Sequence, residues 1–514
     1  MLMSAAEYRE SLLRLRPRVF VDGRAIDCVA HEPALAPGIA AIGVTYDFAL
    51  REPLAPLMTA RQGTSGRTVN RMLHIDETTT DLLYKLEAVR LVCREAGCAQ
   101  RYLAHDALSA LFQATRRCDE AHGTDYHPRF LAYLHDVQDR DLTLGIAMTD
   151  AKGDRSRRPA AQANRDAYVH IRERRPGGIV IRGCKAIVTA APYVHEFLVM
   201  PCRTMTADEA AFAVCCAVPV DAPGVTIVAR PAGRSGEAAA RFSGTYGQST
   251  GVVLFEDVFV PWSRVFLAGE HAEGGFLTTS YATHHRHSCI GARAGFGDLL
   301  IGAGALMIEA NGLDPDRHGH VRDAMVELIT ITESFFACGV AASVYGVADP
   351  AGSLMPDPVF ANIGKLLLAT RIYDMHRLAH EVSGGLIVAL PGPHEDHNPE
   401  TRASLAEVLA GRPDIPAERR LDVARLLEDL TASHQAGWYS VISLHGGGSP
   451  EAMKREIWRN YPVPEKRALV ERLLDRGVLD DGQRASPGPL SRQPGRCCTT
   501  GCQVPPPAPG TADA

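Results

Sequence analysis

Residues 251–266 read GVVLFEDVFVPWSRVF, and this stretch decides the fold class. Its β-branched and aromatic residues, followed by Pro261, are typical of a strand that ends in a turn. Segments 167–191 and 224–233 have the same character, with Gly and Pro between short apolar runs. The sequence therefore predicts a β-domain of roughly 120 residues in the middle of the chain.

Helical periodicity lies on both sides of this region. Segment 76–97 is an example, because acidic residues stand near its start and Gly97 follows its last apolar residues. There is no internal repeat and no alternation of strands with helices, which argues against a Rossmann or TIM-barrel architecture. We predict an α+β protein with a helical N-terminal domain, a middle β-domain and a C-terminal helical domain interrupted near 389–402. The expected bounds are 1–137, 138–272 and 273–478.

Composition narrows the functional class. The chain has 514 residues and a net charge of −6, so it lacks the basic excess that binding to nucleic acid or anionic membranes requires. The longest apolar run, 210–220, is about half of a membrane span. The N-terminal twenty residues lack the apolar core of a secretory signal, and we expect a cytoplasmic protein.

Thirteen cysteines occur without any CxxC pair, which fits reduced thiols better than a zinc ribbon. Three of them, Cys497, Cys498 and Cys502, fall in a Pro- and Gly-rich tail at 479–514. We expect that tail to be disordered, because it has almost nothing to bury.

The general motif screen is mostly negative. The chain has no GxxxxGK[ST] loop, no GxSxG elbow and no HExxH, and GFGDLLIG at 295–302 has the wrong spacing for a dinucleotide loop. GGGSP at 446–450 allows either close backbone approach to a phosphate or ring, or a plain connection between helices.

Five segments taken together, in this order, resemble one family: CAQRYLAHDA, GTDYH, AMTDAKGDRSRRP, HHRHSCIGARAGFGD and SLHGGGSPEA, which begin at residues 98, 123, 147, 284 and 443. The family is the 4-hydroxyphenylacetate 3-hydroxylase / 4-hydroxybutyryl-CoA dehydratase superfamily of flavoproteins. The resemblance implies an acyl-CoA-dehydrogenase-like fold with a β-barrel-like middle domain, bound FAD and a homotetramer.

The resemblance also implies the flavin contacts. Thr189 matches a position near the reactive N5 side of the flavin. Two further segments match parts of the family that contact the flavin: the first is a strand with the loop after it, and the second is a C-terminal loop. Their residues are Met148, Thr149, Asp150, Lys152 and Arg155, and His445, Gly446, Gly447 and Ser449. Lys and Arg suit a diphosphate. The alternative is an ordinary surface charge run.

The local sequence in these segments is more similar to the dehydratase branch, which holds a [4Fe–4S] cluster with three Cys and one His. Cys98 and His285 match two ligands, but Tyr102 and Ala292 stand where the other two thiols belong. Because a cubane needs all its ligands, we expect no iron-sulfur cluster and no metal. Cys289, on the same helix face as His285, is the one credible substitute.

Further dehydratase positions are changed. Its active-site Tyr, Lys and Glu fall at Cys289, Arg293 and Ile442, which removes general acid–base groups. Cys93 precedes Cys98 by five residues and is expected on another face of a continuous helix.

The hydroxylase branch needs no metal. Its phenolate-binding Arg matches Arg101, while its Tyr and His positions read His105 and Ile146. Arg101 and His105 are suited to polarise a phenolic oxygen; the alternative is that Arg101 pairs with an acidic neighbour such as Asp106. Arg101, His105 and His285 are the catalytic candidates.

The sequence thus favours an FAD-dependent two-component monooxygenase for a small phenolic substrate in aromatic catabolism, with a separate flavin reductase. A dehydratase/isomerase acting on a CoA thioester is the alternative, and a catalytically decayed flavin-binding subunit is a third reading.

Overall fold

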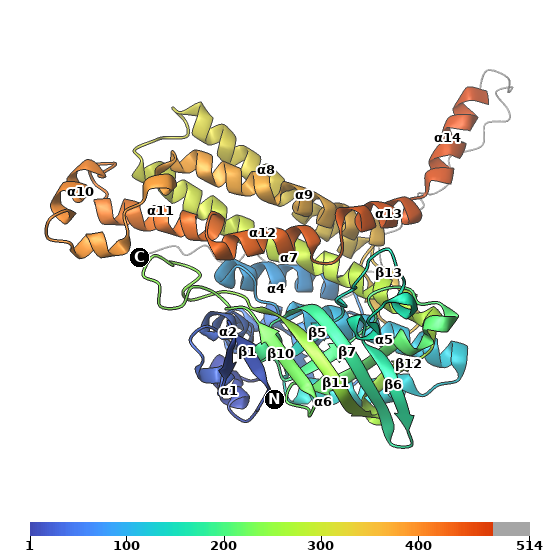
Figure 1. The fold of residues 1–514 in the computed structure, drawn as a ribbon. Helices are drawn as coiled ribbons and strands as arrows, with labels where there is room; N and C mark the ends of the chain where they lie inside the picture. Colours follow the sequence, from blue (N-terminus) through green and yellow to red (C-terminus); the bar gives the residue numbers. More distant parts are fainter. Residues whose placement is uncertain (476–514) are drawn as a thin grey trace.

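The computed structural model describes residues 1–475, so the segment predicted to be disordered, 479–514, lies outside the described residues. The long helices of the C-terminal region form one layer of the molecule and the strands of the middle region lie beneath it (Figure 1). This helical, β, helical order confirms the predicted fold class. The exact domain bounds stay predictions.

The N-terminal region is mainly helical. Its α4 begins at a capping box, in which Thr78 accepts a hydrogen bond from the Asp81 amide, and Gly97 follows its end at a φ of 66°. The predicted helix within 76–97 is therefore confirmed. The helices are α1 (Ala5–Leu12), α2 (Ala36–Leu50), α3 (Ala55–Met58), α4 (Thr79–Ala96), α5 (Tyr102–His122) and α6 (Tyr126–Asp139).

Short strands accompany these helices. β3 (Thr59–Arg61) and β4 (Thr68–Asn70) form a hairpin, whereas β1 (Val19–Val21) and β2 (Arg24–Ile26) join the middle region. There β1 lies parallel to β10, with Val19 opposite Ile227. The N-terminal segment thus contributes to the central sheet as well as to the helical layer.

The middle region contains two sheets. One has the order β2-β1-β10-β11-β7-β6 and the other β12-β9-β8-β5, and Phe197 and Phe255 pack edge to face with ring centroids 6.4 Å apart. The strands are β5 (Leu144–Ala147), β6 (His170–Arg175), β7 (Gly178–Thr189), β8 (Glu196–Val199), β9 (Val214–Pro219), β10 (Val225–Ala229), β11 (Thr250–Pro261) and β12 (Val265–Ala268).

The barrel-like closure implied by the family resemblance is not found in residues 1–475. The three-residue β2 and the largely exposed β6 form the two edges of the larger sheet, and no strand pairing joins them. Register shifts between β11 and β7 mark bulges, which bend a strand locally.

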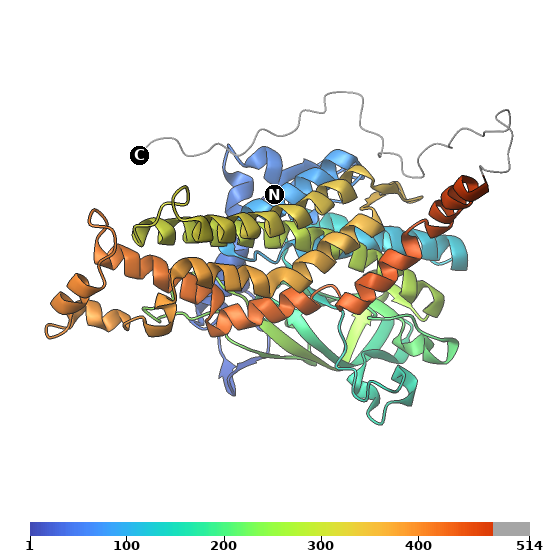
Figure 2. The ribbon, with the colours of Figure 1, turned by 90° about the horizontal axis from the view of Figure 1, so that it is seen from above.

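The C-terminal region is a helical bundle around α7 (His271–Ala310), which packs on α4 and α5 on one side and on α8 and α9 on the other. Seen from above, the long helices run side by side across the sheets (Figure 2). The predicted interruption near 389–402 is confirmed by two short 3-10 turns. The remaining elements are α8 (Gly319–Val344), β13 (Val347–Ala348), β14 (Leu354–Met355), α9 (Pro358–Ser383), α10 (Arg402–Val408), α11 (Ala417–Thr431), α12 (His434–His445), α13 (Pro450–Asn460) and α14 (Val463–Asp475).

Two described helices, α7 and α8, have the length and apolar composition of a membrane span. Core helices of soluble proteins meet the same criterion, and most of the apolar part of α7 is buried among its neighbours. These two helices are therefore weak indications of a membrane segment.

Candidate functional site

Three buried cations meet beside α7. Arg293 donates from Nε to Ser443 Oγ (2.6 Å), Lys365 donates to the Ser443 carbonyl (2.6 Å), and Arg286 donates from Nε to the Gly447 carbonyl (2.9 Å). Each cation is at most 4 % exposed, and within residues 1–475 none forms an ion pair with a carboxylate. Burial lowers the pKa of Lys365 to about 8 and that of Arg286 to about 10. A buried cation without an anion beside it is costly, so this site is suited to an anion, whether a neighbouring thiolate or a bound ligand.

The loop that follows α12 lies directly on these cations. Gly447 has a φ of +76°, and a Cβ there would stand 3.2 Å from His285 Cδ2 and 3.8 Å from Lys365 Cε. The loop then enters α13, where Ser449 Oγ accepts a hydrogen bond from the Ala452 amide (3.3 Å). The structure thus brings Gly447 of the predicted loop against His285, and the close approach requires glycine.

Thiols lie next to the same cations. Cys98 Sγ is 3.5 Å from the Tyr102 hydroxyl and 3.7 Å from Nη1 of Arg293, and Cys289 Sγ is 3.5 Å from His285 Nε2. The Tyr102 ring stacks on His285 with centroids 6.2 Å apart, so Tyr102 separates the two thiols. Three of the four positions compared with cluster ligands, Cys98, Tyr102 and His285, are therefore neighbours in space, together with the substitute Cys289.

The expectation that Cys93 lies on a different face from Cys98 is wrong. Helix α4 ends at Ala96, and the positive φ of Gly97 turns the chain back, so Cys98 is no longer on that helix. The resulting hydrogen bond from Cys93, opposed by burial and aided by Arg293, lowers the pKa of Cys98 to about 5. The helix stop at Gly97 was visible in the sequence and was the signal for this contact.

This set of side chains does not fit a [4Fe–4S] cluster. Tyr102 and Ala292 supply no thiolate, and Arg293 places a cation beside Cys98. Among residues 1–475, no group of three His, Cys, Asp or Glu side chains is placed to hold a metal ion. The absence of iron stays a prediction for chemical analysis.

Arg101 and His105 are held by protein partners. Arg101 is fully buried, forms an ion pair with Asp141, and lies 3.9 Å from the Tyr46 ring centroid. His105 lies between the Asp76 carboxylate (2.8 Å) and the Arg71 carbonyl (2.9 Å). Neither side chain faces the buried cations, and the partner of Arg101 is Asp141, not Asp106.

The segment expected to contact a flavin begins at the end of β5. The Thr149 carbonyl accepts a hydrogen bond from the Ala186 amide on β7 (2.8 Å). Asp150 forms an ion pair with Lys185 (2.8 Å), whose ammonium also donates to the Met148 carbonyl (2.8 Å). Asp150 therefore fixes the loop to β7.

The next part of the loop carries two cations of a different kind. Within the described part of the chain, Lys152 and Arg155 form no ion pair, whereas Arg157 pairs with Asp154 and Arg158 pairs with Glu209. Lys152 is partly exposed and Arg155 is exposed. Their charges are therefore available to a ligand such as a diphosphate.

Two chains of contacts connect β7, to which Asp150 fixes this loop, with the C-terminal helices. Thr189, at the end of β7, pairs with Thr250 on β11, and the Trp438 indole on α12 donates to the Thr250 hydroxyl (3.4 Å). Lys185 also donates to the Met200 carbonyl, and the adjoining Pro201 carbonyl accepts from Thr278 on α7. Thr278 and Arg286 are separated by about 12 Å of helix, a span that an extended dinucleotide covers.

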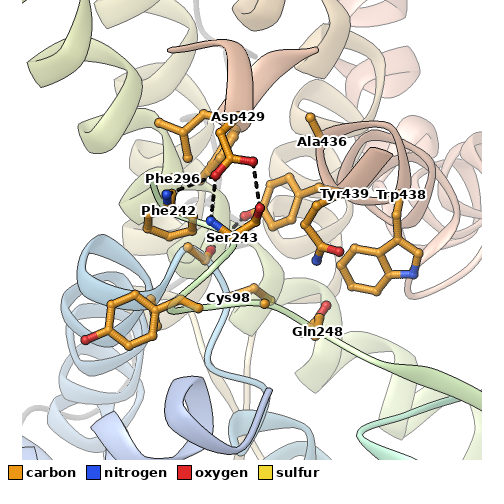
Figure 3. A pocket seen from close by; sticks show the side chains of 15 residues that line it. Cys98, Phe242, Ser243, Gln248, Phe296, Asp429, Ala436, Trp438 and Tyr439 are labelled. Atoms are coloured by element: carbon orange, nitrogen blue, oxygen red, sulfur yellow. Dashed lines mark hydrogen bonds between the residues drawn. The ribbon is translucent and has the colours of Figure 1, made fainter. Parts of the chain in front are cut away.

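A narrow pocket with about 30 Å³ of free volume, partly open to solvent, reaches Cys98 (Figure 3). Phe242, Phe296, Trp438 and Tyr439 line it with aromatic surface. Its wall is held by Asp429, which accepts hydrogen bonds from Phe242 and Ser243, including one of 2.6 Å from the Ser243 hydroxyl. The sequence reading missed this pocket and the cations Arg286 and Lys365, because their neighbours come from segments far apart.

Comparisons with known proteins agree with this architecture. The family models described as 4-hydroxyphenylacetate 3-hydroxylase N terminal and C terminal match residues 4–267 and 275–475. The chain is 34% identical to 4-hydroxybutyryl-CoA dehydratase/vinylacetyl-CoA-Delta-isomerase of Clostridium aminobutyricum, covering 92% of this chain and 99% of that one. It is 25% identical to the 4-hydroxyphenylacetate 3-monooxygenase oxygenase component of Thermus thermophilus, covering 92% and 98%.

Solved structures are similar along the same length. An oxygen-tolerant archaeal 4-hydroxybutyryl-CoA dehydratase from N. maritimus superposes with a TM-score of 0.89 at 33% identity, covering 95% of this chain and 98% of that one. The oxygenase component HpaB in complex with FAD shares the fold, with a TM-score of 0.83 at 22% identity and coverage of 93% and 99%. The chain therefore belongs to the 4-hydroxyphenylacetate 3-hydroxylase (HpaB) family.

Proposed function

We propose that this protein is an FAD-dependent enzyme, the oxygenase component of a two-component monooxygenase that hydroxylates a small phenolic substrate. FAD fits the residues present: Lys152 and Arg155 are free to bind its diphosphate, and Gly447 leaves room against His285. When bound, the flavin supplies the redox chemistry, with electrons from a separate reductase.

The observation that carries the proposal is the buried group of Arg286, Arg293 and Lys365, which no carboxylate in residues 1–475 neutralises. A phenolate has the charge for such a site, and a cation next to its oxygen favours the ionised form. Because Asp141 and Asp76 hold Arg101 and His105, we assign the phenolate contact to Arg293 and Lys365. His285 is positioned by Asp106 to exchange a proton at Nε2.

The test is product formation from reduced FAD, oxygen and a panel of small phenols. We expect a hydroxylated product whose yield falls at least about tenfold in Arg293→Gln, because a desolvated charge contact is lost. Arg455→Gln, an exposed residue on α13 with an i,i+4 partner, is the matched control. No phenol-dependent oxygen consumption with FAD bound would contradict the proposal.

A second candidate is dehydration or isomerisation of a hydroxyacyl-CoA. It is favoured by 34% identity to the clostridial dehydratase over 92% of the chain, and a buried cation group also suits the enolate of a thioester. The missing cluster ligands at Tyr102 and Ala292 count against it. Turnover of 4-hydroxybutyryl-CoA or vinylacetyl-CoA without oxygen, and without a response to phenols, would establish it instead. A decayed subunit would bind FAD and catalyse neither reaction.

We further propose a cytoplasmic homotetramer. Exposed apolar side chains on the outer helices support an oligomer, among them Val326 and Ile329 on α8 and Tyr373 on α9. Sedimentation of the FAD-containing protein measures the assembly, and a monomer would contradict this part of the proposal.

A further inference from the structure

We propose that Cys289, His285 and Asp106 form a catalytic triad in which Cys289 is a nucleophile that accepts an acyl group from an activated ester or thioester. This activity goes beyond flavin chemistry, since the acyl transfer neither consumes nor needs a flavin.

The three side chains stand in the order that nucleophilic catalysis requires. Cys289 Sγ lies 3.5 Å from His285 Nε2, and His285 Nδ1 lies 3.0 Å from Asp106 Oδ2. Cys289 and His285 are one turn apart on the same face of α7, and Asp106 comes from α5. Nucleophile, base and orienting carboxylate are thus connected through the two ring nitrogens.

Asp106 is fixed in place. Its Oδ1 accepts a hydrogen bond from the Ser288 hydroxyl (2.6 Å) and lies 3.8 Å from the Lys85 ammonium. Asp106 and Lys85 are fully buried. Because its carboxylate cannot rotate away, Asp106 holds the Nδ1 proton of His285 and leaves Nε2 facing the thiol.

The electrostatics of the pair differ from those of an ordinary buried cysteine. Burial opposes ionisation of Cys289, yet His285, Lys365 and Arg293 together outweigh it and lower the pKa of the thiol. Burial also disfavours a charged imidazole, but Cys289 and Asp106 raise the pKa of His285 to about 10. By contrast, burial raises the pKa of Cys338, which lies on neighbouring α8.

The two cations assigned above to a phenolate oxygen also act on Cys289. Arg293 and Lys365 both favour the Cys289 thiolate, and neither has a carboxylate partner within residues 1–475. Attack on an acyl carbonyl places negative charge on its oxygen. Fixed buried cations stabilise that charge strongly, as oxyanion-binding groups do in other acyl-transfer sites.

The step balances without an oxidant or a reductant. The Cys289 thiolate forms a bond to the carbonyl carbon, and the bond from that carbon to the leaving oxygen or sulfur breaks. The leaving group departs with the electron pair and takes the proton from Nε2 of His285. The products are an S-acyl Cys289 and a free alcohol, phenol or thiol.

The experiment uses the FAD-containing protein and p-nitrophenyl acetate as the acyl donor. We expect release of p-nitrophenol together with one acetyl group on Cys289, located by peptide mass spectrometry. Cys289→Ala should abolish both signals. His285→Gln should slow acetylation by about 100-fold, as loss of a general base does. Cys338→Ala, a half-buried thiol without a histidine partner, is the matched control and should leave the rate unchanged.

Acetylation of Cys98 or Cys338 at the rate of Cys289, an undiminished rate in His285→Gln, or no acetylation at all would overturn the proposal. Thermal melting checks that each variant is folded, and the pH profile of acetylation should change in His285→Gln. These outcomes are independent of phenol hydroxylation, so the two proposals fail separately.

Discussion

Nη1 of Arg293 lies 3.7 Å from Sγ of Cys98, although the two residues are far apart in the sequence. The same nitrogen donates to the Tyr439 hydroxyl (3.1 Å), which in turn donates to the Gly97 carbonyl (2.9 Å). One guanidinium thus joins α7, α12 and the turn after α4. It favours the thiolate of Cys98, a residue that lines the aromatic pocket in Figure 3.

Replacement of both Lys152 and Arg155 by Ala should weaken FAD binding. Charge-assisted hydrogen bonds contribute about 1.5–3 kcal/mol each, so the Kd should rise at least about tenfold. Titration of the apoprotein followed by flavin fluorescence measures this. Arg157→Ala is the control, because Arg157 already pairs with Asp154. This variant should bind FAD as the wild type does.

Anaerobically purified protein should contain sub-stoichiometric iron, because Tyr102 and Ala292 supply no ligand. Iron and acid-labile sulfide are measured chemically, together with the visible spectrum. A content of about four irons per chain that disappears in Cys98→Ser would refute this and restore the dehydratase mechanism.

Arg101→Ala should lower the stability of the folded protein. It leaves the Asp141 carboxylate buried without its ion pair, which costs about 3–5 kcal/mol. The free energy of unfolding, measured in urea, should fall by that amount. If the variant keeps its stability and loses only phenol hydroxylation, Arg101 contacts the substrate and our placement of the phenolate is wrong.

Gly447→Ala should reduce FAD affinity, because a Cβ at a φ of +76° is strained and would press on His285. Gly437→Ala is a matched change on α12, where an added Cβ meets nothing within 4 Å. Equal FAD affinity in the two variants would show that the loop does not contact the cofactor.

The protein should lose stability as the pH falls, because His195 is buried in its neutral form. Burial, aided by Arg101, lowers its pKa from 6.5 to about 3, and its Nδ1 accepts the Thr143 amide proton (2.9 Å). Below pH 6.5 the unfolded chain binds a proton that the folded protein does not, so stability is lost as the pH falls towards 3. The slope is about 1.4 kcal/mol per pH unit for this group.

Unfolding measured in urea between pH 7 and 4 should show a shallower slope for His195→Gln. His320→Gln, at an exposed position, should follow the wild type. An unchanged slope in His195→Gln would mean that this histidine is charged in the folded protein.

Local signals predicted much of the fold. The capping residues of α4, the β-branched runs of β7 and β11 and the Pro-rich interruption before α10 are each encoded within a few residues. Open or closed arrangement of the sheets was not predictable in this way. It depends on strand lengths and on bulges in the pairing of β11 with β7, a strand more than sixty residues earlier in the chain.

The candidate site shows the same limit. The family motifs indicated Lys152, Gly447 and His285 as site residues. Lys365 stands alone between the short apolar runs of α9, and nothing in that segment indicated its contact with Ser443. Arg101 was weighed against Asp106 because they are close in sequence, whereas its partner Asp141 is contributed by a turn after α6. Partners chosen by tertiary packing are outside the reach of a local pattern.

The pairing of β1 with β10 has a consequence for biosynthesis. Val19 leaves the ribosome about two hundred residues before Ile227, so the first strand waits unpaired during much of translation. An amino-terminal fragment that stops before β10 would expose the edge of β1 and the apolar side chains Val19 and Val21. Such a fragment should aggregate or recruit chaperones, and cooperative folding should begin only after β10 has emerged.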